Sequence, residues 1–126
     1  MLTVYTLQIR FLAEGACQVW NGSLTVSHIN TLERIQKAAL RIILGEKYQS
    51  YNKSLELLNL ETLASRRKQL CMSFARKASK DTKFKIWFSN LTKPTRTDPI
   101  FAVPRSRTAA YEKSPLIYLT KLLNIE

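Results

Sequence analysis

Residues 63–79 read LASRRKQLCMSFARKAS, and this stretch decides the fold because its apolar residues recur at helical spacing. The apolar members share one stripe of a helical wheel: Leu63, Leu70, Cys71, Phe74 and Ala78. An amphipathic helix of this kind is stabilised mainly by packing its apolar stripe against other elements. The stretch therefore predicts a long helix that buries one face against the rest of the chain.

The sector outside this stripe is positively charged. It holds Arg66, Arg76, Lys77 and Lys80 together with uncharged polar residues, and no acid. Glu and Lys at i,i+4 would stabilise an isolated helix, and this sector has no such pair. The cations repel one another unless an anionic partner lies alongside, so the sector is predicted to be a binding surface.

Arg67 differs from these cations because it falls in the middle of the apolar stripe. Its aliphatic stem can cover the core while its guanidinium pairs with a carboxylate. Glu33 and Glu56 are the candidate partners. We therefore expect a structural ion pair at Arg67, and a loss of stability when this residue is replaced.

The formal net charge of +11 is concentrated in the middle of the 126-residue chain. Residues 1–63 carry six Lys or Arg and five acids, whereas residues 64–107 carry twelve Lys or Arg and two acids. Residues 108–126 are neutral overall. A field of this sign and density attracts polyanions, among which nucleic acid is the commonest, ahead of anionic membranes and acidic proteins.

The first twenty residues have apolar side chains at helical spacings of three or four. These are Leu2, Tyr5, Ile9, Leu12, Ala16 and Trp20. They predict one continuous amphipathic helix over residues 2–20, which the turn-forming string Asn21-Gly22-Ser23 ends.

A second long helix is expected over residues 25–44. Thr25 or Ser27 can act as its N-cap, and Gly45 is expected to stop it in the αL conformation. Gln36 falls within its broad apolar sector. The opposite sector carries a cationic stripe of Arg34, Lys37 and Arg41.

Two segments after the basic helix are less regular. The first places four apolar residues beside two lysines: Phe84, Ile86, Trp87 and Phe88 with Lys83 and Lys85. It is either an apolar element docked on the helices or an aromatic platform on which nucleobases stack between cations. The second, residues 92–107, contains three of the four prolines and no helical period, which indicates an extended arm.

Ser114 is expected to cap, and Pro115 to open, a final short helix with a leucine-rich face. The sequence thus predicts an all-α fold: a small helical bundle with an extended basic arm and a short C-terminal docking helix. We expect the bundle over residues 1–90, the basic Pro-containing arm over residues 91–110, and the helix that docks on the bundle over residues 111–126.

Residue patterns for catalysis are missing from the sequence. Two-metal nucleic-acid enzymes use at least two carboxylates to hold metal ions about 4 Å apart, and this chain offers no close pair of acids. His28 is the only histidine and lies at the start of a predicted helix, where it is expected to cap the helix. The three glycines are scattered and form no phosphate-binding loop. We therefore expect no catalytic residue, no metal site and no cofactor, and a chain that is not an enzyme by itself.

Cys17 and Cys71 are isolated thiols within apolar helical patterns, and we expect both to be buried and reduced. Such cysteines fit an intracellular protein, nuclear or cytoplasmic. Arg10 and Glu14 interrupt the N-terminal apolar run, which is too short and too charged to span a bilayer. No membrane partner is expected. Adsorption of the basic helix to an anionic membrane is a weaker option, because its apolar stripe is needed for the core.

Four strings along the chain carry a resemblance. They are VYTLQIRFLAEGACQVWNGSLT (4–25), INTLERIQKAALRIILG (29–45), SLELLNLETLASRRKQLCMSFARKA (54–78) and AYEKSPLIYLTKLLN (110–124). In order and spacing they resemble the region that follows the palm in reverse transcriptases of jockey-like non-LTR retrotransposons. The LERIQ-x-x-ALRIILG and SPLIYLTKLLN strings are the most specific, and the resemblance extends over almost the whole chain.

The resemblance implies a C-terminal, helix-rich, thumb-like segment that grips nucleic acid beside a polymerase active site. The Phe/Tyr-x-Asp-Asp motif of the family belongs to its palm, and this chain contains no Asp-Asp. The implied partners are RNA or DNA and a reverse transcriptase palm domain. The family commonly has Glu-Tyr-Gly or Glu-Tyr-Ala in the first helix, whereas Gly15 follows Glu14 here. A glycine inside a helix costs about 0.5–1 kcal/mol relative to alanine.

The expected nucleic-acid contacts are backbone contacts without base readout. The predicted binding residues are Arg34, Lys37, Arg41, Arg66, Arg76, Lys77, Lys80, Lys83, Lys85, Arg105 and Arg107. An alternative from another class is a degenerate remnant or protein interaction module that docks through an exposed apolar helix face around Tyr5, Leu12 and Trp20. Salt-dependent binding to oligonucleotides favours the first hypothesis, and a salt-insensitive dimer favours the second.

Overall fold

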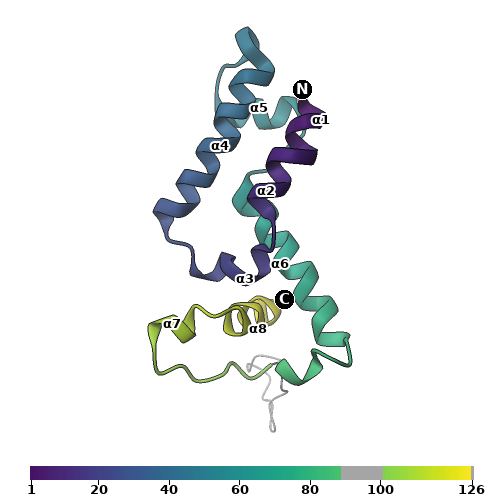
Figure 1. The fold of residues 1–126 in the computed structure, drawn as a ribbon, viewed down its shortest axis with the longest axis vertical. Helices are drawn as coiled ribbons and strands as arrows, with labels where there is room; N and C mark the ends of the chain where they lie inside the picture. Colours follow the sequence, from purple (N-terminus) through teal and green to yellow (C-terminus); the bar gives the residue numbers. More distant parts are fainter. Residues whose placement is uncertain (89–100, 126) are drawn as a thin grey trace. The chain divides into compact units, whose positions relative to one another are not determined.

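The computed structural model describes residues 1–88 and 101–125, which form helices and turns without a β-strand (Figure 1). The predicted all-α fold class is confirmed. The chain divides into two compact units: unit 1 comprises Met1–Ala16 and Leu24–Arg67, and unit 2 comprises Cys17–Ser23 and Lys68–Glu126. Residues 91–100 of the predicted basic arm lie outside the described residues, so the predicted domain boundaries stay predictions.

Unit 1 begins with a helical stretch that changes type twice. It consists of α1 (Leu2–Val4), a π-helical turn η1 (Tyr5–Ile9) and α2 (Arg10–Glu14). The π turn is closed by the N–H of Arg10, which donates to the carbonyl of Tyr5, five residues earlier. In a regular α-helix Tyr5 and Leu12, seven residues apart, would lie on the same face. The extra residue of the π turn shifts the later side chains around the axis, and Tyr5 is 2% exposed whereas Leu12 is 80% exposed.

The predicted continuous helix over residues 2–20 is wrong. Gly15 has an extended backbone conformation (φ −54°, ψ 124°) and ends α2. The next residue, Ala16, has a positive φ of 52°, which a helix does not accept. Gly15, at which the sequence differs from the family it resembles, therefore lies next to the point where the chain leaves unit 1.

The second long helix of unit 1, α4 (Val26–Leu44), lies beside the α1–α2 stretch (Figure 1). Thr25, one of the two predicted alternatives, is the N-cap of α4. The Thr25 side chain accepts a hydrogen bond from the N–H of His28, and the Nδ1 of His28 accepts one from the N–H of Thr25. His28 therefore caps the helix, as predicted. Gly45 ends the helix with a positive φ of 54°, but its ψ of −120° is not the predicted αL value.

A short helix, α5 (Tyr51–Leu57), follows α4 after the 3-10 turn η3 (Gly45–Lys47). Ser50 caps α5 by accepting a hydrogen bond from the N–H of Lys53. Helix α6 (Leu63–Lys80) matches the predicted long basic helix at both ends within one residue. Its first residues, up to Arg67, belong to unit 1, and the others belong to unit 2.

The interior of unit 1 is organised by a polar residue, Gln36, which is 0% exposed. Its Oε1 accepts a hydrogen bond of 2.7 Å from the hydroxyl of Tyr5. Its Nε2 donates to the hydroxyl of Tyr51 and to the carbonyl of Glu61, each at 3.0 Å. One side chain thus connects the N-terminal stretch, α4, α5 and the turn before α6, and the sequence had assigned this position to an apolar sector.

Glu33, one helical turn before Gln36, extends the same network to α6. Its Oε2 accepts a hydrogen bond from the hydroxyl of Tyr51. Its Oε1 accepts a 2.9 Å hydrogen bond from the N–H of Ala64, a free donor in the first turn of α6. The negative charge of the carboxylate also interacts favourably with the positive end of the α6 dipole. Glu33 therefore caps α6 from a residue that is distant in the sequence.

Unit 1 is expected to lose stability above pH 10 because of these buried phenols. Burial, above all, raises the pKa of Tyr5 from 10.0 to about 12, and burial together with the hydrogen bond to Glu33 raises the pKa of Tyr51. Between pH 10 and 12 the unfolded chain releases a proton that folded Tyr5 retains, so the free energy of unfolding falls by roughly 2 kcal/mol.

Urea unfolding between pH 8 and 12 measures this loss. The decline above pH 10 should shrink in Tyr5→Phe, relative to the stability of that variant at pH 8, and persist in the control Tyr111→Phe, whose side chain is exposed. An unchanged decline in Tyr5→Phe would contradict the assignment.

Unit 2 packs α3 (Cys17–Trp20) and the later part of α6 against a C-terminal helix, α8 (Pro115–Ile125). Shorter elements connect them: the 3-10 turns η2 (Asn21–Ser23) and η4 (Lys85–Trp87), and α7 (Ala109–Glu112). The buried core consists of Cys17, Cys71, Ala75, Ala78, Phe88, Leu119, Leu122 and Leu123. Cys17 and Cys71 are buried and free, as predicted, with their Sγ atoms 3.9 Å apart.

Side-chain amides fix both ends of α8 within unit 2. The Asn124 side chain accepts from the N–H of Phe101 at 2.9 Å and donates to its carbonyl at 3.0 Å. The Nδ2 of Asn21 donates to the hydroxyl of Tyr118 at 2.7 Å. Helix α8 begins at Pro115 as predicted, but the predicted side-chain cap is not formed, because the buried Oγ of Ser114 has no hydrogen-bond partner among the described residues.

No helix in residues 1–88 or 101–125 combines the length and the apolar character that a membrane crossing requires.

Candidate nucleic-acid interface

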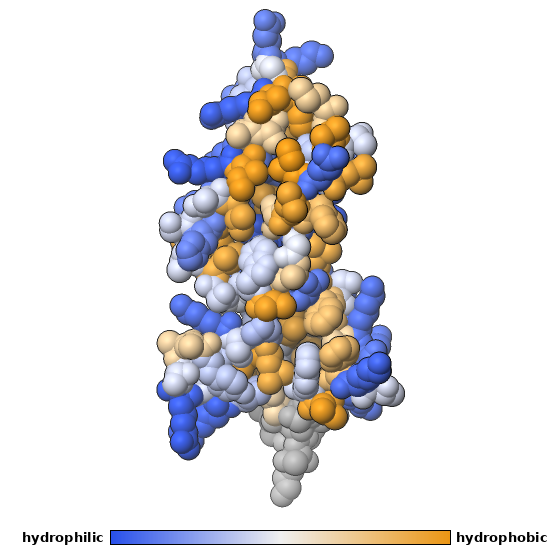
Figure 2. All heavy atoms as spheres, in the orientation of Figure 1, coloured by the Kyte–Doolittle hydropathy of each residue, from blue (hydrophilic) through white to orange (hydrophobic). Residues whose placement is uncertain are grey.

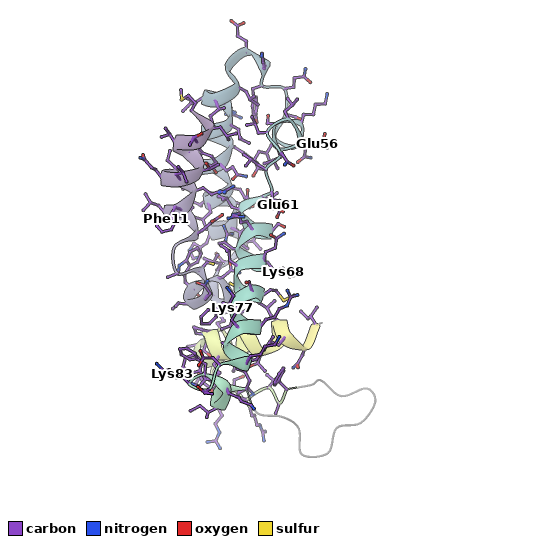
Figure 3. The ribbon with its side chains drawn as sticks, turned by 90° about the vertical axis from the view of Figure 1, so that its right-hand side faces the viewer. Phe11, Glu56, Glu61, Lys68, Lys77 and Lys83 are labelled. Carbon is purple, nitrogen blue, oxygen red and sulfur yellow. The ribbon has the colours of Figure 1, made fainter. Side chains whose placement is uncertain are left out.

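Five exposed cations gather at the end of α6 and in the turn that follows it, all within unit 2. We call them the basic cluster: Arg76, Lys77, Lys80, Lys83 and Lys85. Figure 3 places Lys77 on α6 and Lys83 just beyond its end. By sequence, unit 2 carries twelve Lys or Arg and four acids, a net charge of +8. Most of the protein's positive charge therefore belongs to the unit that contains this cluster.

The local sequence explains why the turn after α6 keeps these lysines together. The Oδ1 of Asp81 accepts a 2.8 Å hydrogen bond from the N–H of Lys83, and the carbonyl of Asp81 accepts one of 2.8 Å from the N–H of Lys85. Asp81 thus uses its carboxylate to form a turn, as Asp commonly does. The one acid inside this segment is engaged with the backbone that carries the cations.

Part of the basic cluster also has a structural role. Lys77 and Lys80 lie in the last turn of α6, where a cation interacts favourably with the negative end of the helix dipole by about 0.3–1 kcal/mol. Lys83 and Lys85 lie beyond the helix and gain nothing from that interaction. Helix stabilisation therefore does not account for the whole cluster.

The aromatic segment beside the cluster divides between core and surface. Phe88 is 4% exposed and its ring centroid is 6.0 Å from that of Phe101, so it packs as an apolar anchor. Phe84 lies between Phe74, at 6.5 Å, and Trp87, at 4.8 Å. Trp87 is 44% exposed. Of the two alternatives predicted for this segment, an apolar element docked on the helices describes Phe88. Trp87 instead presents an accessible aromatic surface next to cations.

A small pocket of about 200 Å³ lies beside Lys77 of the basic cluster. Its lining residues are Phe74, Lys77, Ala78, Asp81 and Phe84. Lys77 and Asp81 give it charges of both signs, and the two phenylalanines give it an apolar wall. The pocket therefore brings Lys77 of the basic cluster next to Phe84 of the aromatic segment.

The predicted cationic stripe of α4 lies in unit 1. Arg34 and Arg41 are exposed and Lys37 is half-buried. The Nζ of Lys37 lies 5.1 Å from the ring centroid of Tyr51, and the Cζ of Arg41 lies 5.4 Å from that of Tyr48. These distances are typical of cation–π contacts, which restrain both side chains. The sequence did not predict them, because the tyrosines come from a different element.

Arg66, at the start of α6, and Arg10, in α2, both lie close to one carboxylate of unit 1. The Nε of Arg66 forms a 2.7 Å ion pair with the Oε1 of Glu14, and the Nε of Arg10 lies 3.7 Å from the same oxygen. Neither contact is a hydrogen bond. Arg66 was predicted to bind nucleic acid, whereas the structure pairs it with a carboxylate within its own unit.

Arg67 is 0% exposed, in agreement with its place in the apolar stripe. Of its two candidate partners, Glu33 accepts hydrogen bonds from Ala64 and Tyr51, and Glu56 is exposed. The ion pair of Arg67 with one of these carboxylates stays a prediction.

Arg105 and Arg107 complete the predicted set. Both are exposed and lie in residues 101–108 of unit 2, which contain no helix. Lys68 on α6 and Lys113 before α8 are exposed cations of the same unit that the sequence analysis did not select. The signal for Lys68 was the net charge of residues 64–107 rather than a helical position, whereas Lys113 lies in residues 108–126, which are neutral overall and gave no such signal.

In the part of the chain that the structure describes, no three His, Cys, Asp or Glu residues gather as a metal-binding group. Comparison with protein-family models, with curated proteins and with solved structures gives no match to this chain.

Proposed function

We propose that this chain is a non-catalytic module that binds the backbone of nucleic acid, and that it derives from the thumb-like region of a non-LTR retrotransposon reverse transcriptase. The observation that carries the proposal is the basic cluster: five exposed cations in one short segment, whose one acid forms a turn with the backbone. Template–primer duplex or RNA is the proposed ligand. The resemblance of the four sequence strings supports the origin.

Backbone binding fits this surface because phosphates need positive charge more than a particular shape. Each phosphate that a cation neutralises releases counterions from the nucleic acid, and this release supplies most of the non-specific affinity. Arg76 can also form bidentate hydrogen bonds with a phosphate, whereas the lysines act as point charges. The cluster therefore supplies affinity without sequence preference.

Removing two charges from the basic cluster should reduce the salt dependence of binding. In Lys77→Gln/Lys80→Gln, the slope of log K against log salt on duplex DNA is expected to become shallower by about 1.8, because each lost phosphate contact removes about 0.9. Fluorescence anisotropy with a labelled duplex at several salt concentrations measures this slope.

The matched control is Lys47→Gln/Lys53→Gln, which removes the same charge from exposed positions of unit 1. Its slope should change by less than half as much. Equal effects of the two double variants would show that net charge, and not the basic cluster, determines binding.

A second candidate function, protein–protein docking, is favoured by an apolar face on unit 1. Leu7, Phe11 and Leu12 are 69%, 68% and 80% exposed, and Val4 is 53% exposed. Figure 2 shows apolar side chains gathered over the region where Figure 1 draws α1, α2 and α4, and Figure 3 shows Phe11 on the outside of α2. Of the predicted face, Leu12 belongs to this surface, whereas Tyr5 is buried.

Light scattering at low and high salt tests this second candidate. A dimer that persists at high salt and dissociates in Leu7→Ser/Leu12→Ser would favour docking, and its absence at micromolar concentration would exclude self-association through this face. Oligonucleotide titration of the same variant shows whether the two functions are separable.

A further inference from the structure

A second, more apolar pocket lies in unit 2, beyond the aromatic segment. It has a volume of about 290 Å³ and is lined by Trp87, Tyr111, Ser114, Pro115, Leu116 and Leu119. Elements far apart in the sequence form it: η4, the end of α7 and the first turns of α8. None of these lining residues belongs to the basic cluster.

This pocket adjoins the basic cluster through a pair of rings. Phe84 lines the small pocket beside Lys77, and its ring centroid is 4.8 Å from that of Trp87, which lines the apolar pocket. Lys85 lies in the same 3-10 turn as Trp87, and Lys113 directly precedes Ser114. A phosphate chain held by the cluster would therefore pass within reach of the pocket.

The lining residues suit a flat ring with a polar edge. Trp87 and Tyr111 are 44% and 41% exposed, so two aromatic rings remain accessible at the pocket. The volume is at the small end of the range for ligand pockets, about 300–1,000 Å³, which fits one ring system. The buried Oγ of Ser114 has no hydrogen-bond partner among the described residues, and a polar ring edge would supply one.

We infer that this pocket receives one unpaired nucleobase of the nucleic acid whose backbone the basic cluster binds, stacked on Trp87 or Tyr111. The inference rests on the proposed function and deepens it, because it names single-stranded nucleic acid, or an unpaired end, as the preferred ligand. Stacking on an aromatic side chain tolerates any base, since every base has a π-face. The site therefore adds preference for single strands without sequence readout.

An abasic oligonucleotide separates the base from the backbone. The full chain is titrated with a short oligothymidylate and with an abasic strand of the same length and charge, at one salt concentration. The oligothymidylate should bind about 5- to 150-fold more tightly, the range that corresponds to stacking of one base. Trp87→Ala or Tyr111→Ala should remove most of this ratio, depending on which ring the base stacks on, whereas Lys77→Gln/Lys80→Gln should weaken the binding of both strands by the same factor; a ratio unchanged in both ring variants would overturn the inference.

The outcomes distinguish the two proposals. Equal affinity for both strands overturns the nucleobase pocket and leaves backbone binding in place. No binding of either strand overturns both. If Trp87→Ala does not fold, photocrosslinking of the unmodified chain to an iodouracil-substituted strand decides: adducts on Trp87 or Tyr111 support the inference, and adducts confined to other residues overturn it.

Discussion

Replacing Gln36 with alanine is expected to lower the free energy of unfolding of unit 1 by about 3 kcal/mol or more. The substitution removes hydrogen-bond partners from the hydroxyls of Tyr5 and Tyr51 and from the carbonyl of Glu61. A buried polar group that loses its partner costs about 1–3 kcal/mol, and Gln36 is fully buried. Native domains are stable by only about 5–15 kcal/mol, so a loss of this size removes a large fraction of the stability of unit 1.

Urea unfolding followed by circular dichroism measures this effect. The control is Gln8→Ala, which removes the same side chain from an exposed position of η1 in the same unit, and its effect should stay within about 0.5 kcal/mol. A loss below 1 kcal/mol in Gln36→Ala would show that the three hydrogen bonds do not organise unit 1.

Replacing Gly22 with alanine should destabilise unit 2 by about 1–3 kcal/mol, the usual cost of forcing atoms into a packed interior. A Cβ at this position would lie 2.7 Å from both the Cβ and the Cγ of Tyr118. Tyr118 cannot simply rotate away, because its Cβ is attached to the backbone of α8 and its hydroxyl accepts from Asn21. The η2 turn and α8 would have to separate.

Gly15→Ala is the matched control for this prediction. Its Cβ would meet no atom closer than 3.6 Å, and the φ of −54° is ordinary for alanine. The control should be neutral or slightly stabilising, because it reduces the freedom of the unfolded chain. Thermal unfolding compares the two, and a lower melting temperature for Gly15→Ala than for Gly22→Ala would contradict this account of the packing.

Periodicity predicted the long helices of this chain well and the first helix badly. Helices α4 and α6 have apolar stripes repeated over four turns or more, so a local disturbance cannot hide the pattern. The N-terminal stretch contains a π turn at Tyr5–Ile9 and a break at Gly15 and Ala16. Both disturb the regular spacing that the prediction assumed, and neither is specified by the apolar pattern alone.

Polar residues in the interior were the main source of error within the elements. The helical wheel of α4 places Gln36 in the apolar sector. Its buried side chain forms hydrogen bonds instead of apolar contacts alone. Glu33 caps α6 by accepting from the N–H of Ala64, thirty-one residues later in the chain. Such partners are set by tertiary contacts, which a single sequence does not display.

The candidate site was partly visible in the sequence. The basic cluster follows from the charge of residues 64–107, and the exposure of Arg76, Lys77 and Lys80 agrees with the helical wheel of α6. The pairing of Arg66 with Glu14 and the pocket of Trp87 and Tyr111 were not visible, because their members lie far apart in the chain.

The salt dependence of nucleic-acid binding by the full chain tests the central claim most directly. The account predicts that log K falls linearly with log salt, with a slope of about −4.5 to −5.4 on duplex DNA if five or six cations contact phosphates. Binding that is undetectable at low salt, or that does not change with salt, would contradict the account.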